Sequence, residues 1–380
     1  MSVPRRNTNS NLHGAKRAKN DEFFTRLQDI EAEVAHYVRG SGRNKRNPFE
    51  GAVVYLNCDD PFESNFFKYF AMKFKPLGLK ALIATTYVGS YLTGKGLALE
   101  EIAGLRPALD AGQEVRAYGV ELTDVRDVTG DGEVGWDDIE QMLRTDPSVV
   151  FPLEGDGDFR SEECVELLKR SDVVVTNPPF SLFREYVAQL IEHDKKFLII
   201  GNMNAITYKE VFPLVRENRL WYGPSISSGD REFGVPDTYP LHAAGWRVDE
   251  AGNKFIRVKG VRWFTNLDHR RRHEELDLVR YYEGNEDQYP TYDNYDAIEV
   301  GRTKDIPADY EGVMGAPITF LDKYSPDQFE IVGATESEGK GFSRGLWDSA
   351  SGVAQAVSRG KRVYKRIFIR NLNPQKKIEF

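Results

Sequence analysis

The segment of the chain best suited to chemistry is SDVVVTNPPFSLFREYV (171–187), where Asn177-Pro178-Pro179-Phe180 joins an apolar run to a helical pattern. The Asn177 side-chain carbonyl and the Pro178 backbone carbonyl could each accept one N–H of an exocyclic amine. Such an amine is a poor nucleophile because its lone pair is delocalised, and two acceptors would draw the nitrogen toward tetrahedral geometry for in-line attack on a sulfonium methyl. Both prolines restrict the backbone around these acceptors, and such positioning lowers a reaction barrier. Phe180 offers a flat face on which a flipped base could stack.

Two further segments could hold a cofactor. In GDGDFRSEE (155–163), Asp158 could hydrogen-bond a cofactor's adenine amine and Phe159 could lie against its ring, although an acidic glycine-rich turn is the alternative. In VVYLNCDDP (53–61), a strand ends where a doubly wound fold usually has its glycine-rich cofactor loop. Glycine is missing there, so contacts would have to come from Asn57, Asp59 or Asp60.

Apolar strand-like runs alternate with helical patterns up to about residue 217. The strands expected are 53–56, 81–85, 149–153, 173–176 and 197–200, and the helices expected are 65–74, 161–169, 183–193 and 208–217. This alternation predicts an α/β fold with a parallel sheet covered by helices, whose ligands bind at the carboxyl ends of the strands. Beyond residue 218 come short aromatic-rich runs, such as 263–267 and 362–370, which suggest a smaller mixed or β-rich domain.

The charge of the chain is unevenly distributed. The formal net charge is −8, but residues 121–168 hold 15 acidic residues against three arginines, so the remainder carries +4. Basic clusters lie at 270–272, at 359–377 and in an N-terminal arm containing Arg5, Arg6, Lys16, Arg17 and Lys19. Such clusters are candidates for phosphate contacts, and duplex DNA is the partner they suggest. Solvated tails are the alternative for the terminal clusters.

Composition disfavours several classes. The sequence has no apolar run long enough to span a bilayer and begins with a basic, polar segment, so we expect a cytoplasmic protein. Cys58 and Cys164 are too few for a disulfide framework or a cysteine-rich zinc site. Neither cysteine follows a proline, which disfavours the chemistry of methylation at carbon 5 of cytosine.

The segment DVTGDGEVGWDD (127–138) fits a calcium-loop template. Asp127, Thr129 and Asp131 would be ligands, Glu133 would offer its backbone carbonyl, and Asp138 stands at position twelve. A structural Ca²⁺ is therefore one interpretation. An acidic turn that needs no metal is the other.

The motif around Asn177, together with NCDDP followed by SNFFKYF, GDGDFRS, KKFLIIGNMNAITYKEVF and VMGAPITFLDKY, closely resembles the EcoRI-type adenine-specific (N6) DNA methyltransferases. The likeness runs from about residue 16 to 332 and resumes at 362–371. It implies a Rossmann-like sheet, S-adenosylmethionine as methyl donor, adenine N6 in duplex DNA as target, and base flipping. It also implies that DEFFT (21–25), with Phe24 and Thr25, lies over the cofactor.

The same resemblance predicts three parts of the chain. Residues 1–47 would form a basic arm and a cofactor-covering helix, 48–217 the Rossmann-like catalytic domain, and 218–380 the target-recognition domain with a basic C-terminal tail. Two departures from the family pattern are an acidic insertion at about 121–146 and Thr85-Thr86 at the end of the second strand, where an acidic residue usually contacts the cofactor ribose.

Three hypotheses follow for the activity. The first is a DNA adenine methyltransferase that modifies DNA beside a restriction endonuclease without a stable complex, acting as a monomer. The second is a methyltransferase of protein glutamine amides, and the third is a DNA-binding module without catalysis. Side chains that could read DNA, chosen by position and type, are Arg231, Arg262, Asn266, Arg270 and Lys304.

Overall fold

The computed structural model describes residues 24–38, 46–57, 59–87, 99–227, 230–235, 245–336 and 341–375. The chain divides into two compact units, the first comprising Met1–Met203 and Ser225–Leu267 and the second Asn204–Pro224 and Asp268–Phe380. The segment 225–267 thus returns to the first unit after residues 204–224 have joined the second. In the part of the chain that is described, no helix is long and apolar enough to cross a membrane.

The first unit is built on a large mixed sheet with the strand order β4-β3-β2-β1-β5-β6-β11. Its strands are β1 (Val53–Asn57), β2 (Ala81–Thr85), β3 (Tyr118–Leu122), β4 (Val150–Pro152), β5 (Val173–Thr176), β6 (Lys196–Asn202) and β11 (Val261–Thr265). The pairs β1–β2, β1–β5 and β5–β6 are parallel. The pairs β2–β3, β3–β4 and β6–β11 are antiparallel. The α/β class and all five expected strands are confirmed, and the sheet is mixed, with antiparallel pairs beside the parallel ones that were expected.

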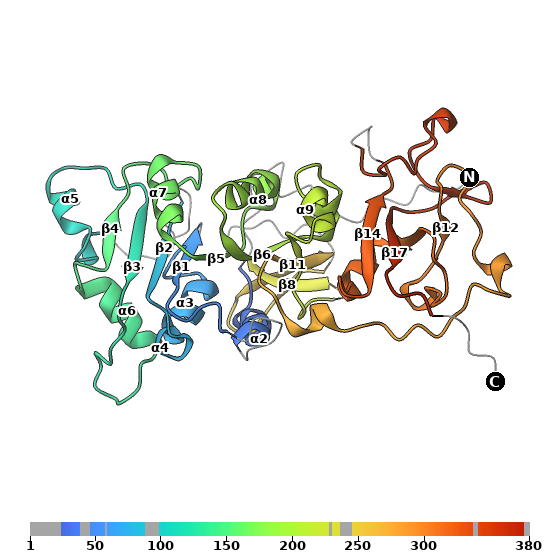
Figure 1. Cartoon of the computed structure of the whole chain (residues 1–380). Helices are drawn as coiled ribbons and strands as arrows, with labels where there is room; N and C mark the ends of the chain where they lie inside the picture. Colours follow the sequence, from blue (N-terminus) through green and yellow to red (C-terminus); the bar gives the residue numbers. More distant parts are fainter. Residues whose placement is uncertain are drawn as a thin grey trace. The chain divides into compact units, whose positions relative to one another are not determined.

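Helices cover both faces of this sheet, with α2, α3 and α6 on one face and α7 and α8 on the other (Figure 1). Their bounds are α2 (Leu27–Val38), α3 (Asn65–Met72), α6 (Trp136–Thr145), α7 (Glu162–Arg170) and α8 (Phe183–Glu192), with the short helices α4 (Phe74–Leu77) and α5 (Arg106–Asp110) between them in the chain. Serine side chains cap two of them. The Ser64 hydroxyl accepts from the amides of Phe66 and Phe67 at the start of α3, and Ser161 accepts from Cys164 in α7.

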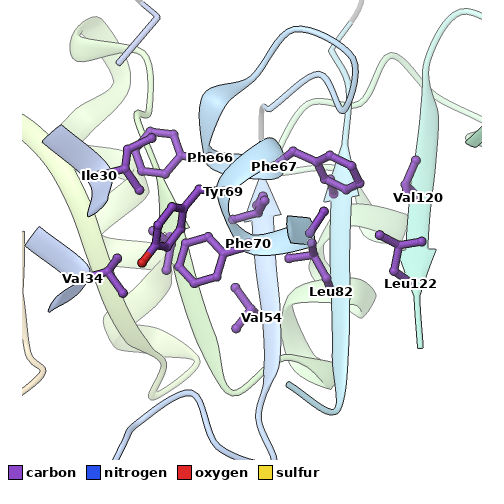
Figure 2. Close-up of a cluster of buried hydrophobic side chains, with 14 of the residues drawn as sticks. Ile30, Val34, Val54, Phe66, Phe67, Tyr69, Phe70, Leu82, Val120 and Leu122 are labelled. Atoms are coloured by element: carbon purple, nitrogen blue, oxygen red, sulfur yellow. The ribbon is translucent and has the colours of Figure 1, made fainter. Parts of the chain in front are cut away.

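Figure 2 shows the core between α2, α3 and strands β1 to β3, where the labelled apolar side chains converge. Alternate residues of each strand, such as Val54 in β1 and Leu82 in β2, face this core, as expected for a period of two. Aromatic side chains of α3 fill it, and the Phe70 ring packs edge-on against Phe49 with centroids 5.3 Å apart. This packing fixes α3, and with it the loop between β1 and α3.

A small antiparallel sheet, β8-β10-β9, also belongs to the first unit. Its strands are β8 (Asp230–Val235), β9 (Arg247–Val248) and β10 (Lys254–Lys259). Phe233 and Ile256 from this sheet enter the same core as α2 and α3. Phe24 pairs with Gly234 of β8 through two backbone hydrogen bonds of 2.8 and 2.9 Å. The chain just before α2 is thereby held against the sheet.

The second unit contains mostly strands and short turns. Its four-stranded sheet has the order β12-β13-β17-β14, formed by β12 (Ile298–Glu299), β13 (Met314–Pro317), β14 (Phe329–Ala334) and β17 (Arg366–Asn371). Outside this sheet lie α9 (Phe212–Arg216), β7 (Trp221–Tyr222) and the hairpin strands β15 (Val357–Ser358) and β16 (Lys361–Arg362). Phe368 of β17 packs against Tyr292 and Tyr295 in the core of this unit.

Candidate active site

The carboxyl ends of β1, β2 and β5 meet at one edge of the sheet, because these strands are parallel neighbours. Asn57 ends β1, Thr85 ends β2 and Thr176 ends β5. Oγ1 of Thr176 lies 2.7 Å from the backbone oxygen of Asn57 and 2.5 Å from Oδ2 of Asp59. The residue that follows, Asn177, is therefore tethered beside the end of β1.

The motif 177–180 has the strand–turn–helix placement expected of it. Pro178 is buried, whereas Asn177, Pro179 and Phe180 are partly buried. Phe180 begins a short 3₁₀ turn that leads directly into α8, and its ring packs against the core of the first unit. The backbone of Asn177 and Pro178, which carry the two proposed acceptor carbonyls, is thus fixed by a buried strand on one side and a helix on the other.

Asp59 is a buried carboxyl group at the centre of this edge, with 7% of its surface exposed. Ser64 donates a hydrogen bond of 2.6 Å from Oγ to Oδ1 of Asp59. Burial raises the pKa of Asp59 to about 7, although the hydrogen bonds from Ser64 and Thr176 oppose this shift. The Thr176 hydroxyl has one proton, which it can donate to the Asn57 backbone oxygen, since a carbonyl only accepts. When Asp59 is protonated, its carboxyl group can donate to Oγ1 of Thr176, so both short contacts of Thr176 are then hydrogen bonds.

The raised pKa of Asp59 predicts a pH dependence of stability. The folded state holds a proton that the unfolded chain releases near pH 4, so this contribution is present below pH 4 and is lost as pH rises to about 7. Across that window, the free energy of unfolding should fall by up to about 1.4 kcal/mol per pH unit through this group. Asp59→Asn keeps a donor and an acceptor but cannot ionise. Urea unfolding at pH 5 and pH 8 should therefore show a smaller decrease for the variant than for the parent chain, and equal decreases would refute the assignment.

Ser64 has two roles, which a matched pair of variants can separate. It caps α3 and also donates to the buried carboxyl group of Asp59, whereas Ser161 caps α7 and its other side-chain contact is with the thiol of Cys164 in the same helix. Ser161→Ala should cost about 1 kcal/mol of unfolding free energy. Ser64→Ala should cost about 1–3 kcal/mol more, because a buried carboxyl loses a partner. Chemical denaturation of both variants measures this, and equal losses would show that the Asp59 contact contributes nothing.

Asp60 and Tyr118 form a second buried polar contact at this edge. Oδ1 of Asp60 accepts from the Phe62 amide at 2.9 Å and from the Tyr118 hydroxyl at 3.4 Å. Burial and the neighbouring Asp60 carboxylate raise the pKa of Tyr118 well above its ordinary value. Asp60 thereby orders the turn between β1 and α3.

Thr25 carries a buried hydroxyl that has no hydrogen-bond partner among the described residues. Its exposed fraction is 4%, and its backbone oxygen accepts from Nδ2 of Asn65 at 2.8 Å. Asn65 opens α3, so this contact joins the chain before α2 to the loop that carries Asp59 and Asp60. Buried hydroxyls normally have a partner, and a polar group of a bound ligand would supply one.

The glycine-rich loop 155–159 lies against the end of β2. Gly157 has φ +75°, and a Cβ at this position would lie 1.8 Å from the backbone oxygen of Thr86. Arg160 holds both carboxylate oxygens of Asp158, with Nε–Oδ1 of 2.8 Å and Nη2–Oδ2 of 2.6 Å, and these bonds lower the pKa of Asp158. Phe159 is buried edge-on against Tyr186 at 5.0 Å, so its ring packs inside the protein.

Comparison with known proteins identifies the chain. Residues 11–372 match the family model described as adenine-specific methyltransferase EcoRI. The chain belongs to the EcoRI family of adenine-specific methyltransferases. Type II methyltransferase M.EcoRI of Escherichia coli is 46% identical over 98% of this chain and 100% of its own length. Type II methyltransferase M.MpnI of Mycoplasma pneumoniae is 37% identical over 84% of this chain and 83% of its own. No solved structure matches the chain. The predicted family and the predicted class of enzyme are confirmed.

In this methyltransferase, sequence reasoning overlooked three residues that shape the site. Thr176, Ser64 and Tyr118 contact the acidic residues predicted to bind the cofactor. The position of Thr176, immediately before the Asn-Pro-Pro motif, was a usable signal, and so was the cap position of Ser64. Tyr118 gave no usable sequence signal, because the strand that contains it was not predicted.

The acidic loop brings together three of the predicted calcium ligands. One carboxylate oxygen each from Asp127, Asp131 and Asp138 lies within 4.8 Å of the others. Asp138 is buried and accepts from the amides of Thr129, Gly135 and Val128 at 2.8 Å each, and these bonds lower its pKa. The Thr129 hydroxyl also donates to Asp138, and the Glu133 amide to Asp131. Backbone amides and the Thr129 hydroxyl hold these carboxylates without a metal, so calcium binding stays a prediction.

The residues predicted to read DNA fall into three groups. The N-terminal arm with Arg5, Arg6, Lys16, Arg17 and Lys19 lies outside the described residues. Two candidates make structural contacts instead: Arg262 is buried and donates to the Val261 and Ser227 carbonyls, and Asn266 bridges the Phe197 amide and the Lys195 carbonyl. Arg231 is partly buried, whereas Arg270 and Lys304 are exposed.

Proposed function

We propose that this chain transfers the methyl group of S-adenosylmethionine to N6 of an adenine flipped out of duplex DNA, as the modification enzyme of a restriction–modification system. The observation that carries the proposal is the tether between Thr176 and the end of β1, which sets the Asn177 motif beside the acidic residues of the first strand. Membership of a family of adenine-specific methyltransferases supports the choice of target. We expect a cytoplasmic monomer that forms no stable complex with the endonuclease.

The residues at the strand ends fit S-adenosylmethionine. Thr25 has a buried hydroxyl available for a ligand, and Asn57, Asp59, Asp60 and Asp158 supply acceptors for its amines and hydroxyls. Phe24, which pairs with Gly234 of β8, would cover the cofactor, and Phe159 would lie against its adenine ring. When bound, this group supplies a methyl on a positively charged sulfur, and nearby carboxyl groups suit that charge.

The chain's own groups then act on the adenine. The Asn177 side-chain carbonyl and the Pro178 backbone carbonyl accept the two amine hydrogens, while Pro178 and Pro179 hold both acceptors in place. Phe180 stacks on the flipped base. As the nitrogen forms its bond to the methyl carbon, the carbon–sulfur bond breaks and leaves its electron pair on sulfur, and the methylated amine releases one proton to water, so the charge balances. The target-recognition role falls to residues 218–380 and the cofactor-covering role to residues 1–47.

A methyl-transfer assay tests the proposal against both alternatives. Cofactor labelled in its methyl group is incubated with the full chain and either duplex DNA or total cell protein. We expect label in DNA, and after digestion to nucleosides we expect it in N6-methyladenine. Label in protein alone would favour the glutamine-amide methyltransferase. DNA binding without any label transfer would favour the inactive binding module.

A further inference from the structure

A short basic hairpin in the second unit has no part in the site described above. Strands β15 and β16 pair antiparallel, Val357 with Arg362 and Ser358 with Lys361. The two turn residues, Arg359 and Gly360, have φ of 52° and 72°. Positive φ at both positions is the geometry of a type I′ turn, the tightest common hairpin connection. Residues 359–362 are all exposed, so three cations lie within four residues at the tip.

The base of this hairpin is fixed to the rest of its unit. Asn294 is buried and donates through Nδ2 to the carbonyls of Val353 at 2.6 Å and Gln355 at 2.9 Å. Its Oδ1 accepts from the Val357 amide at 2.8 Å. The Asp293 carboxylate accepts from the Gly360 amide at 2.8 Å, which holds the turn itself. A tip held in this way loses little conformational entropy on binding.

The cations of the tip differ from other basic side chains of the same unit. Arg302 is paired with Asp305 at 2.6 Å and Arg370 with Glu330 at 3.0 Å. Within the described residues, Lys361 and Arg362 form no ion pair, and Arg359 donates to the backbone carbonyl of Asp287. Residues 349–378 contain no acidic side chain, and the Asp293 carboxylate accepts from the Gly360 backbone amide at the turn.

An exposed aromatic ring lies two residues beyond β16. Tyr364 is 62% exposed, although its hydroxyl lies within 3.4 Å of Oδ1 of Asn204. Exposed rings beside unpaired cations are a combination found in nucleic-acid-binding surfaces, where cations bind phosphates and rings contact sugars or bases. A narrow two-stranded ribbon also has the dimensions to enter a groove of duplex DNA.

We propose that the 357–362 hairpin is a DNA-contacting element, in which Lys361 and Arg362 bind backbone phosphates and Tyr364 lies against the same duplex. The inference rests on the function proposed above and adds a specific surface to it. Phosphate contacts of this kind give affinity and register without reading sequence. The hairpin therefore strengthens binding to cognate and non-cognate duplexes alike.

The test is the salt dependence of duplex binding by the full chain, measured by fluorescence anisotropy between 50 and 200 mM salt. Each phosphate contact contributes about 0.9 to the slope of log affinity against log salt. Lys361→Ala/Arg362→Ala should therefore lower the slope by about 1.8 and weaken binding about 10- to 100-fold at 0.1 M salt. Lys361→Arg/Arg362→Lys keeps both charges and should restore the parent slope. Tyr364→Ala should weaken binding about fivefold or more without changing the slope.

Lys73→Ala/Lys75→Ala is the charge-matched control. These exposed lysines lie between α3 and the start of β2, at the edge of the sheet opposite the strand ends, and their removal should leave the slope unchanged. An unchanged slope in the hairpin variant, in a preparation that methylates DNA, would overturn the inference while leaving the proposed function intact. If the parent chain neither binds nor methylates duplex DNA, the proposed function itself fails.

Discussion

Asn177→Ala should slow single-turnover methylation by about 10²- to 10³-fold and leave cofactor affinity unchanged. The substitution removes one of two acceptors aimed at the target amine, and loss of one preorganised electrostatic contact has an effect of this size. The tether below it is untouched, because Thr176 contacts Asn57 and Asp59 through its own hydroxyl. Rapid-quench measurement of the chemical step, with equilibrium dialysis of the labelled cofactor, gives both quantities.

A control for this result is Asn253→Ala, which removes the same side chain from an exposed turn between β9 and β10. Its methylation rate should equal that of the parent chain. If Asn177→Ala lost cofactor affinity in proportion to its loss of rate, Asn177 would act on the cofactor and the assignment to the adenine amine would be wrong. DNA affinity should also be retained, since the substitution leaves the basic surfaces unchanged.

The part of the site that sequence predicts best depends on local signals. An apolar run that ends at two consecutive prolines determines both the end of β5 and the start of the next turn, so Asn177 could be placed from its neighbours alone. The strand expected at 53–56 and the helix expected at 65–74 were equally readable. These elements are specified by hydrophobic period, proline geometry and caps, all of which act within a few residues.

What the sequence did not predict depends on contacts between distant residues. Strand β3 (Tyr118–Leu122) is short, contains glycine and glutamate, and runs antiparallel to β2 only because of pairing across the sheet. The buried state of Arg262 has the same origin, since all five residues of β11 are buried in the folded unit. An arginine outside the acidic segment 121–168 suggests a DNA contact by type, whereas Arg262 donates to backbone carbonyls whose positions are fixed by tertiary structure.

The need for glycine at position 157 comes from a long-range contact of the same kind, and we expect it to be the most sensitive position of loop 155–159. A methyl group there would overlap the backbone oxygen of Thr86, and neither atom can rotate away, because the backbone fixes the position of Cβ and the oxygen belongs to the main chain. The φ of +75° adds a conformational cost of about 1–2 kcal/mol for any L-residue. Overpacking adds about 1–3 kcal/mol.

We therefore expect Gly157→Ala to lower the free energy of unfolding by about 2–5 kcal/mol and, by shifting the loop that carries Asp158, to reduce single-turnover methylation by about 10²-fold. Gly112→Ala is the matched control, because Gly112 has a similar φ of +78° but no atom within 4 Å of the added methyl. That control should show only the backbone cost of about 1–2 kcal/mol and an unchanged rate. Urea unfolding and cofactor binding of the two variants separate the cost of positive φ, which both share, from the overlap with Thr86, which only Gly157→Ala has. Equal losses in both would mean that loop 155–159 does not pack against the end of β2, and the positioning of Asp158 at the candidate site would have to be abandoned.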